Sequence, residues 1–135
     1  MSDRREFLKI SLAAAAGMAA AHVLPASAES APLPDGIVYS AEKPGKWSEK
    51  VKSHAPVATV NGNKVSVKTE HGMSEEHYIV RHTLVSKTGE VLGEKTFHPS
   101  DKEAVSVFEI PAGHTALFAT SFCNKHDFWV TAFTI

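Results

Sequence analysis

The chain has 135 residues, of which 43% are hydrophobic and 21% charged, as expected for one globular domain with a buried core. A formal net charge of −1 argues against a nucleic-acid partner, because such proteins usually present a basic face. The single cysteine excludes an internal disulfide. Eight histidines are many for a chain of this length and are the first indication of the chemistry of the protein.

The N-terminus has the three-part pattern of a signal peptide. Arg4 and Arg5 precede an alanine-rich apolar run, and Ala-Ser-Ala at 26–28 offers a cleavage site before Glu29. This pattern is typical of the twin-arginine type. A membrane anchor is the alternative, but the run is shorter than the roughly 20 apolar residues that span a bilayer. We therefore expect residues 1–28 to direct export to the periplasm and residues 29–135 to form one domain without a membrane span.

The mature part reads as a series of short strands. Residues 29–50 are rich in Pro, Gly, Ser and Lys and are expected to form an extended arm with turns. Beyond them, alternating or β-branched segments are separated by turn signals, and none shows sustained helical periodicity. This pattern predicts an all-β fold, an immunoglobulin-like antiparallel β-sandwich of about seven strands. The apolar segment 128–135 is expected in the interior of a sheet. The predicted strands are 57–60, 64–69, 77–86, 90–97, 104–110, 115–122 and 128–135.

Three stretches place metal-ligand residue types at predicted strand ends. They are "SHAP" at 53–56, "EHGMSEEHY" at 70–78 and "SFCNKHDFW" at 121–129. The three-residue step between the cysteine and the histidine of the last stretch needs a turn, which lets thiolate and imidazole converge. A loop between the two histidines of the second stretch can do the same. The residues concerned are His54, His71, His77, Cys123 and His126.

Simpler interpretations exist for each residue taken alone. A single histidine is more often a surface or hydrogen-bonded group than a ligand, and this is expected for His82, His98 and His114. A lone cysteine is often a small buried hydrophobic residue, and an exposed free thiol is a liability in an oxidising compartment. Cys123 is therefore expected to be buried or coordinated. The pair Phe128 and Trp129 is expected in the core or as a lid over the site.

A set of four histidines and one thiolate suits iron or copper better than structural zinc, whose closed sites commonly use two or more cysteines. Blue copper usually adds a weak axial methionine, but the last methionine, Met73, precedes Cys123. No G-x-S-x-G elbow for a hydrolase and no phosphate-binding loop are present.

Taken in order, "SHAP", "HGMSEEHYIV" and "FCNKHDFW" resemble the iron centre of the superoxide reductase family, which includes neelaredoxin and the iron-binding domain of desulfoferrodoxin. The resemblance covers most of residues 45–135. It implies a β-sandwich that holds one mononuclear non-haem iron, with Cys123 axial and an open position opposite the thiolate. With one cysteine, the chain resembles the single-iron class that lacks a desulforedoxin-like module. The equatorial ligands implied are His54, His71, His77 and His126.

The same resemblance implies a function. Members of the family reduce superoxide by one electron to hydrogen peroxide, and an external donor then re-reduces the iron. For this chain the expected donor is unidentified, either rubredoxin-like or a cytochrome, and the expected assembly is a homotetramer. A non-catalytic β-sandwich that binds a partner or senses metal remains the alternative, because fold alone does not determine function.

The chain departs from the family just before the first ligand. The family usually reads Glu-Lys-His-Val-Pro, whereas this chain reads Lys-Ser-His-Ala-Pro over residues 52–56. In the family the Glu occupies the sixth iron position of the ferric form, and the Lys attracts superoxide and helps to protonate the product. Here these positions hold Lys52 and Ser53. We hypothesise that the positive charge has moved to Lys52, helped by Lys50 or Lys125, since a basic cluster steers an anion.

Export is predicted to depend on the arginine pair. Replacing Arg4 and Arg5 together by lysine should leave unprocessed precursor in the cytoplasm, because the twin-arginine route needs both guanidinium groups. Fractionation followed by mass measurement checks this. Normal periplasmic processing of the double variant would point to the general secretory route instead.

Overall fold

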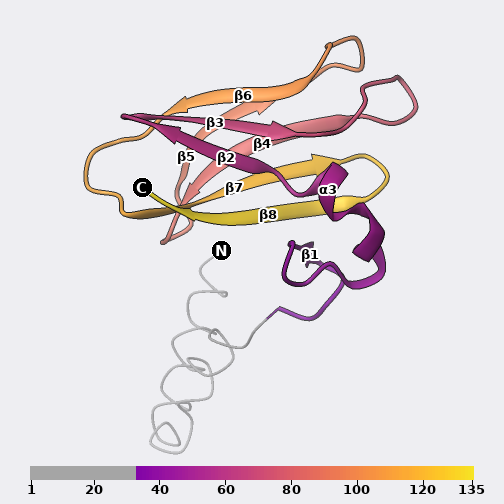
Figure 1. Cartoon of the computed structure of the whole chain (residues 1–135), viewed down its shortest axis with the longest axis horizontal. Helices are drawn as coiled ribbons and strands as arrows, with labels where there is room; N and C mark the ends of the chain where they lie inside the picture. The colour runs from indigo at the N-terminus through magenta and orange to yellow at the C-terminus, as the bar shows by residue number, and fades with distance from the viewer. Residues whose placement is uncertain (1–32) are drawn as a thin grey trace, which may run out of the picture. The chain divides into compact units, whose positions relative to one another are not determined.

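The structure, a computed structural model, describes residues 33–135, so the predicted signal peptide lies outside the described residues. The all-β prediction is confirmed: over residues 33–135, eight strands form two stacked sheets (Figure 1). One sheet has the order β1-β8-β7-β4-β5 and the other β2-β3-β6. The strands are β1 (Val38–Tyr39), β2 (Val57–Asn61), β3 (Lys64–Thr69), β4 (Ile79–Ser86), β5 (Val91–Thr96), β6 (Ala104–Glu109), β7 (Ala116–Cys123) and β8 (Asp127–Thr134).

The seven predicted strands all form, with small shifts at their ends. β3 coincides with the predicted 64–69, whereas β4 begins at Ile79 because His77 remains in the preceding loop. Alternation revealed these strands because one face of each sheet packs on the other sheet.

The expectation for residues 29–50 was wrong in part. Gly45–Lys50 form a 3₁₀ helix, η2, which continues into a single turn of α-helix, α3 (Val51–His54). Helices of one or two turns carry too few residues to show a 3.6-residue period. Over residues 33–135, no helix has the length and apolar character that crossing a membrane requires.

The apolar sequence of β8 predicted that this strand lies in the interior of a sheet. The prediction does not hold along the whole length of β8. β1 pairs only with Phe128 and Trp129, and within β8 only Trp129 is buried. Further along, Thr131 donates a side-chain hydrogen bond to the carbonyl of Pro56 (2.6 Å). Beyond the two residues that pair with β1, the side chains of β8 are partly or fully exposed.

The main core fills the space between the sheets. Val65 and Val67 from β3 face Leu84 from β4, and all three are fully buried. The sheets approach closely beside Phe108: a Cβ at Gly93 would lie 2.6 Å from the Phe108 ring. Only glycine fits there, because interiors are packed at crystal-like density.

A chain of buried hydrogen bonds crosses between the sheets near the end of β3. Thr69 Oγ1 lies 2.8 Å from both His82 Nε2 and Ser121 Oγ, and His82 Nδ1 lies 2.8 Å from Ser106 Oγ. All four residues are buried. His82 is therefore a hydrogen-bonded core residue rather than a surface histidine. Such networks specify a unique packing when every member is satisfied.

His82 should make stability depend on pH. Burial, with a smaller effect of Lys95, lowers the pKa of His82 from 6.5 to about 4. The pKa of His82 is lower in the folded protein than in the unfolded chain, so the unfolded chain binds this proton more readily. The free energy of unfolding is therefore unaffected by His82 above about pH 6.5 and decreases as the pH falls towards 4. The full decrease in the free energy of unfolding is on the order of 3 kcal/mol, at roughly 1.4 kcal/mol per pKa unit.

Urea unfolding of the metal-free protein between pH 7 and pH 4.5 measures this effect. His82→Gln should lose less stability over that range than the unmodified chain, whereas His98→Gln, at an exposed position, should follow the unmodified chain. If the free energy of unfolding falls with pH in parallel for all three proteins, His82 does not control the loss of stability in acid.

Candidate metal centre

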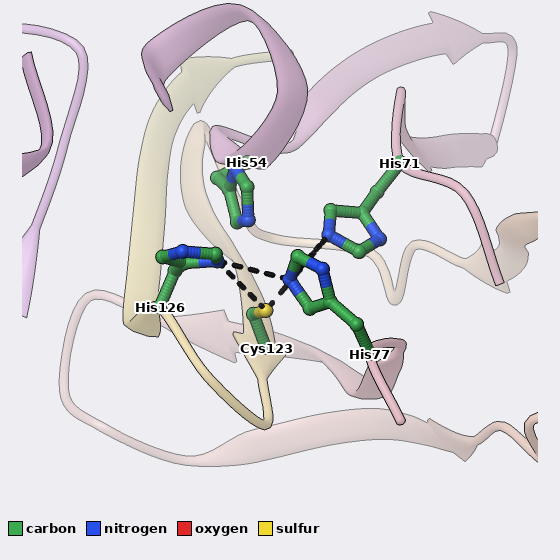
Figure 2. A group of neighbouring side chains, drawn as sticks. All are labelled: His54, His71, His77, Cys123 and His126. Carbon is green, nitrogen blue, oxygen red and sulfur yellow. Dashed lines mark hydrogen bonds between the residues drawn. The ribbon is translucent and has the colours of Figure 1, made fainter. Parts of the chain in front are cut away.

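The structure brings the five predicted ligands to one place (Figure 2). One potential ligand atom from each residue lies within 4.8 Å of every other. The contributing segments are the end of α3, the β3–β4 loop, the end of β7 and the turn before β8. They are far apart in sequence, and the sandwich places them at the same end. The residues are His54, His71, His77, Cys123 and His126.

The four imidazole rings occupy the corners of a quadrilateral with nearly equal sides. The ring centroids along its sides are 4.6 Å (His54–His71), 4.3 Å (His71–His77), 4.7 Å (His77–His126) and 4.7 Å (His126–His54) apart. One diagonal, His54–His77, measures 6.1 Å. This near-square arrangement suits four nitrogen ligands that lie around one ion in a common plane, rather than at the corners of a tetrahedron.

The ligand atoms have spacings suited to a single metal. His77 Nε2 lies 3.0 Å from His71 Nε2 and 2.9 Å from His126 Nδ1. Two nitrogens bound at right angles, each about 2.1 Å from a metal, would be about 3 Å apart. Cys123 Sγ lies 3.7 Å from His126 Nδ1 and 3.9 Å from His71 Nε2. The sulfur therefore adjoins the same point as the nitrogens.

His54 shows most directly that the cluster fits a cation. Its Nδ1 lies 2.7 Å from Ser53 Oγ and 3.2 Å from the carbonyl of Lys50. An Nδ1–H donor directed at these oxygens leaves the lone pair on Nε2, which is buried and has no hydrogen-bond partner. A buried polar atom without a partner costs free energy, and a metal ion would remove that cost.

The protonation states favour metal binding. Burial, followed by the charge of His71, lowers the pKa of His54 to about 4. Burial is also the largest cause of the lowered pKa of His71, His77 and His126. These imidazoles are therefore neutral at pH 7, as ligands must be.

The pKa of the Cys123 thiol shifts in the opposite direction to those of the imidazoles. Cys123 is 1% exposed, and burial raises its pKa. Without a cation the sulfur therefore keeps its proton at neutral pH. A bound metal ion deprotonates a coordinating thiol outright, so metal binding at this site should release one proton from Cys123.

Asn124 joins the two segments that carry His77 and the Cys123–His126 turn. Its Oδ1 accepts from the Tyr78 backbone N–H, and its Nδ2 donates to the carbonyl of Glu76, both at 3.0 Å. The Asn124 N–H also donates to the carbonyl of Tyr78 (3.2 Å). Sequence reasoning missed this residue, although an asparagine inside a turn commonly bonds to nearby backbone.

Local hydrogen bonds also orient the β3–β4 loop. The His71 Nδ1–H donates to the carbonyl of Gly72 (2.5 Å), which leaves Nε2 for the cluster. Backbone bonds in both directions between Ser74 and His77 close a tight turn, and Ser74 Oγ donates to the carbonyl of His77 (3.0 Å). The loop therefore directs Nε2 of both imidazoles towards the cluster, and the Gly72 bond leaves that of His71 unprotonated.

The aromatic pair has separate roles. Trp129 is a fully buried core residue, its indole N–H donates to the carbonyl of His126 (2.9 Å), and its ring lies 6.0 Å from that of His54. Phe128 is half-buried and packs beside Phe122. Trp129 thus supports the centre from within the core rather than covering it.

A cavity of about 390 Å³ lies beside the cluster. His54, His71 and His77 line it together with Lys50 and Glu70, whereas Cys123 does not. The remaining lining residues are Ser53, Gly72, Met73 and Ser74. A small molecule can therefore approach the imidazoles from the side that the thiol does not occupy.

The predicted basic residues differ in position. Lys50 lines the cavity, and its charge helps to lower the pKa of His71, His77 and His126. Lys125, in the turn, acts similarly on His77 and His126. Lys52 is exposed on α3 and is not among the residues that line the cavity. The exposed His98 and the half-buried His114 are not members of the cluster.

Comparison with known proteins gives one family. The superoxide reductase (1Fe-SOR) from Giardia intestinalis is 25% identical over 62% of this chain and 99% of its own, with a TM-score of 0.57. The superoxide reductase from Treponema pallidum is 31% identical over 59% and 66% of the respective chains, with a TM-score of 0.52. Superoxide reductase (neelaredoxin) from Ignicoccus hospitalis, 23% identical over 73% and 93% with a TM-score of 0.61, supports the fold.

No protein in the curated set matches the chain. The family model described as desulfoferrodoxin matches residues 46–132, which include all five clustered residues and the cavity-lining Lys50. The chain therefore belongs to the desulfoferrodoxin family.

Proposed function

We propose that the protein is a superoxide reductase, which converts superoxide to hydrogen peroxide at one non-haem iron. The observation that carries this proposal is the near-square set of four imidazoles with one buried thiol, next to an open cavity. Family membership and the likeness to superoxide reductases from Giardia and Treponema support it.

The family and the ligand set indicate mononuclear iron as the cofactor. When bound, iron would supply the one electron that superoxide takes up, and the Cys123 thiolate would tune this chemistry by donating electron density to the metal. With two protons, superoxide becomes hydrogen peroxide; an external donor, rubredoxin-like or a cytochrome, would return the electron. The atoms that would hold the iron are His54 Nε2, His71 Nε2, His77 Nε2, His126 Nδ1 and Cys123 Sγ.

The chain's own groups prepare the site for an anion. Neutral imidazoles add no negative charge, and the cavity lets a small anion reach them without crossing the core. Of the basic residues considered, Lys50 has the best support as the one that attracts superoxide, because it alone among Lys50, Lys52 and Lys125 lines the cavity. The two protons would enter from water through the same opening.

A metal-binding module without catalysis is the second candidate. It is favoured by Lys52 and Ser53, which stand where the family usually has Glu and Lys. Ser53 lines the cavity but has no ionic charge, and its hydroxyl forms a hydrogen bond with His54. The rate of reaction with superoxide separates the two candidates. The periplasmic location and the homotetramer remain predictions.

Iron binding through sulfur should be visible. Oxidised, iron-loaded protein should have a thiolate-to-Fe(III) charge-transfer band that ascorbate removes. Cys123→Ser should keep the β fold and lose the band, because a hydroxyl is a much poorer electron donor. Lys125→Ala, in the same turn, serves as the control and should keep the band. A Cys123→Ser variant that retains both the band and superoxide reduction would refute the ligand assignment.

Steering by Lys50 should appear in the salt dependence of the rate. Lys50→Ala should lower the second-order rate constant with superoxide about tenfold at low ionic strength and flatten its dependence on salt. Lys52→Ala should stay within about twofold of the unmodified protein, because that side chain lies outside the cavity. Pulse radiolysis at several ionic strengths measures this. An effect confined to Lys52 would restore the hypothesis drawn from the sequence, and no reaction in any variant would favour the non-catalytic module.

A further inference from the structure

Asp127, immediately after the ligand His126, has an unusual backbone conformation. Its φ is 69°, a left-handed value that only Asp127 shows among the non-glycine residues of the described chain. Side chains other than Asn and Asp rarely adopt this conformation. A glycine would be at least as favourable here for the backbone alone. The backbone conformation alone therefore does not call for a carboxylate here.

The carboxylate of Asp127 bonds to a residue far away in sequence. Its Oδ2 accepts a hydrogen bond from the indole Nε1–H of Trp47 (2.9 Å), 80 residues earlier. Trp47 belongs to η2, the helix that leads through Lys50 into the turn carrying His54. The bond thus joins the segment before the first ligand to the turn that carries the last one.

The indole also contacts a ligand directly. The Trp47 and His126 rings lie edge-to-face, with centroids 4.7 Å apart and planes at 90°. Lys46 Nζ lies 4.8 Å from the centre of the Trp47 ring and 3.9 Å from Asp127 Oδ2. Because Lys46 is largely exposed, this ion pair contributes little. The hydrogen bond and the ring contact are the defining interactions.

We propose that Asp127 is a positioning residue for the metal centre, acting through Trp47. The Asp127–Trp47 bond holds η2 against the turn, packs the indole on His126 and keeps the imidazole oriented with Nδ1 towards the other ligands. Partners outside the ligand set that hold a coordinating histidine typically change metal affinity 10- to 100-fold when removed. The bond also keeps Lys50, at the end of η2, beside the cavity; this second consequence rests on the proposed function, whereas the first does not.

Three substitutions separate the hydrogen bond from the backbone. Asp127→Gly relaxes the left-handed backbone and removes the acceptor. Asp127→Asn tolerates the same backbone and keeps an oxygen acceptor, so it is the matched control. Trp47→Phe keeps an aromatic ring beside His126 and removes the donor.

Tryptophan fluorescence of the metal-free protein is the first readout. The chain has two tryptophans, and Trp129 is fully buried, so emission that acrylamide can quench comes from Trp47. Asp127→Gly should raise the acrylamide quenching constant about twofold, and Asp127→Asn should leave it unchanged. The urea midpoint of Asp127→Gly should fall only modestly, because relief of the left-handed backbone offsets part of the lost hydrogen bond.

Binding of Co²⁺, followed by its visible absorption, is the second readout. The dissociation constant should rise about tenfold in Asp127→Gly and in Trp47→Phe and remain unchanged in Asp127→Asn. Unchanged quenching and unchanged Co²⁺ affinity in Asp127→Gly would overturn the proposal, as would equal loss in Asp127→Asn. If Asp127→Gly fails to fold, the Co²⁺ affinity of Trp47→Phe decides between the outcomes: an affinity about tenfold weaker supports the proposal, and an unchanged affinity overturns it. A protein inactive towards superoxide would refute the proposed function and leave these results intact.

Discussion

The metal centre depends on the buried chain of hydrogen bonds that joins Ser106, His82, Thr69 and Ser121 between the two sheets. Thr69 ends β3 in one sheet, and Ser121 lies near the end of β7 in the other. Each stands two residues before a ligand. The His82 imidazole and the Thr69–Ser121 bond thus fix the separation of the two sheets at the end where the ligands emerge. An apolar contact could not do this so specifically, because it has no preferred direction.

The strands and the ligand set could be predicted from the sequence because both leave local signals. Alternation marked β3 and β6, and the residue types at 54, 71, 77, 123 and 126 matched a family pattern. What escaped prediction depends on contacts between distant segments. The bonds of Asn124 to the His77 loop and of Asp127 to Trp47 join residues 46 to 80 positions apart. Likewise, β1 pairs with only two residues of β8, which no property of the β8 sequence itself reveals.

Charge distinguishes this centre from an ordinary histidine cluster. Four neutral imidazoles and one thiolate would leave a divalent or trivalent ion only partly compensated. The surplus positive charge would be reinforced by Lys50 and Lys125, which already disfavour protonation of neighbouring imidazoles. The lysine charges, which add to the effect of burial on the imidazole pKa values, would therefore also favour an incoming anion.

The placement of Cys123 also bears on how long such a centre would survive its own chemistry. Its sulfur is 1% exposed and does not line the cavity that serves the imidazoles. Thiolates are oxidised stepwise by peroxide, first reversibly to sulfenic acid and then irreversibly, and access limits the rate. A peroxide released into the cavity would meet imidazole rings before it met sulfur. The β-sandwich would thus limit contact between the hydrogen peroxide product and the sulfur of Cys123, the most easily oxidised ligand.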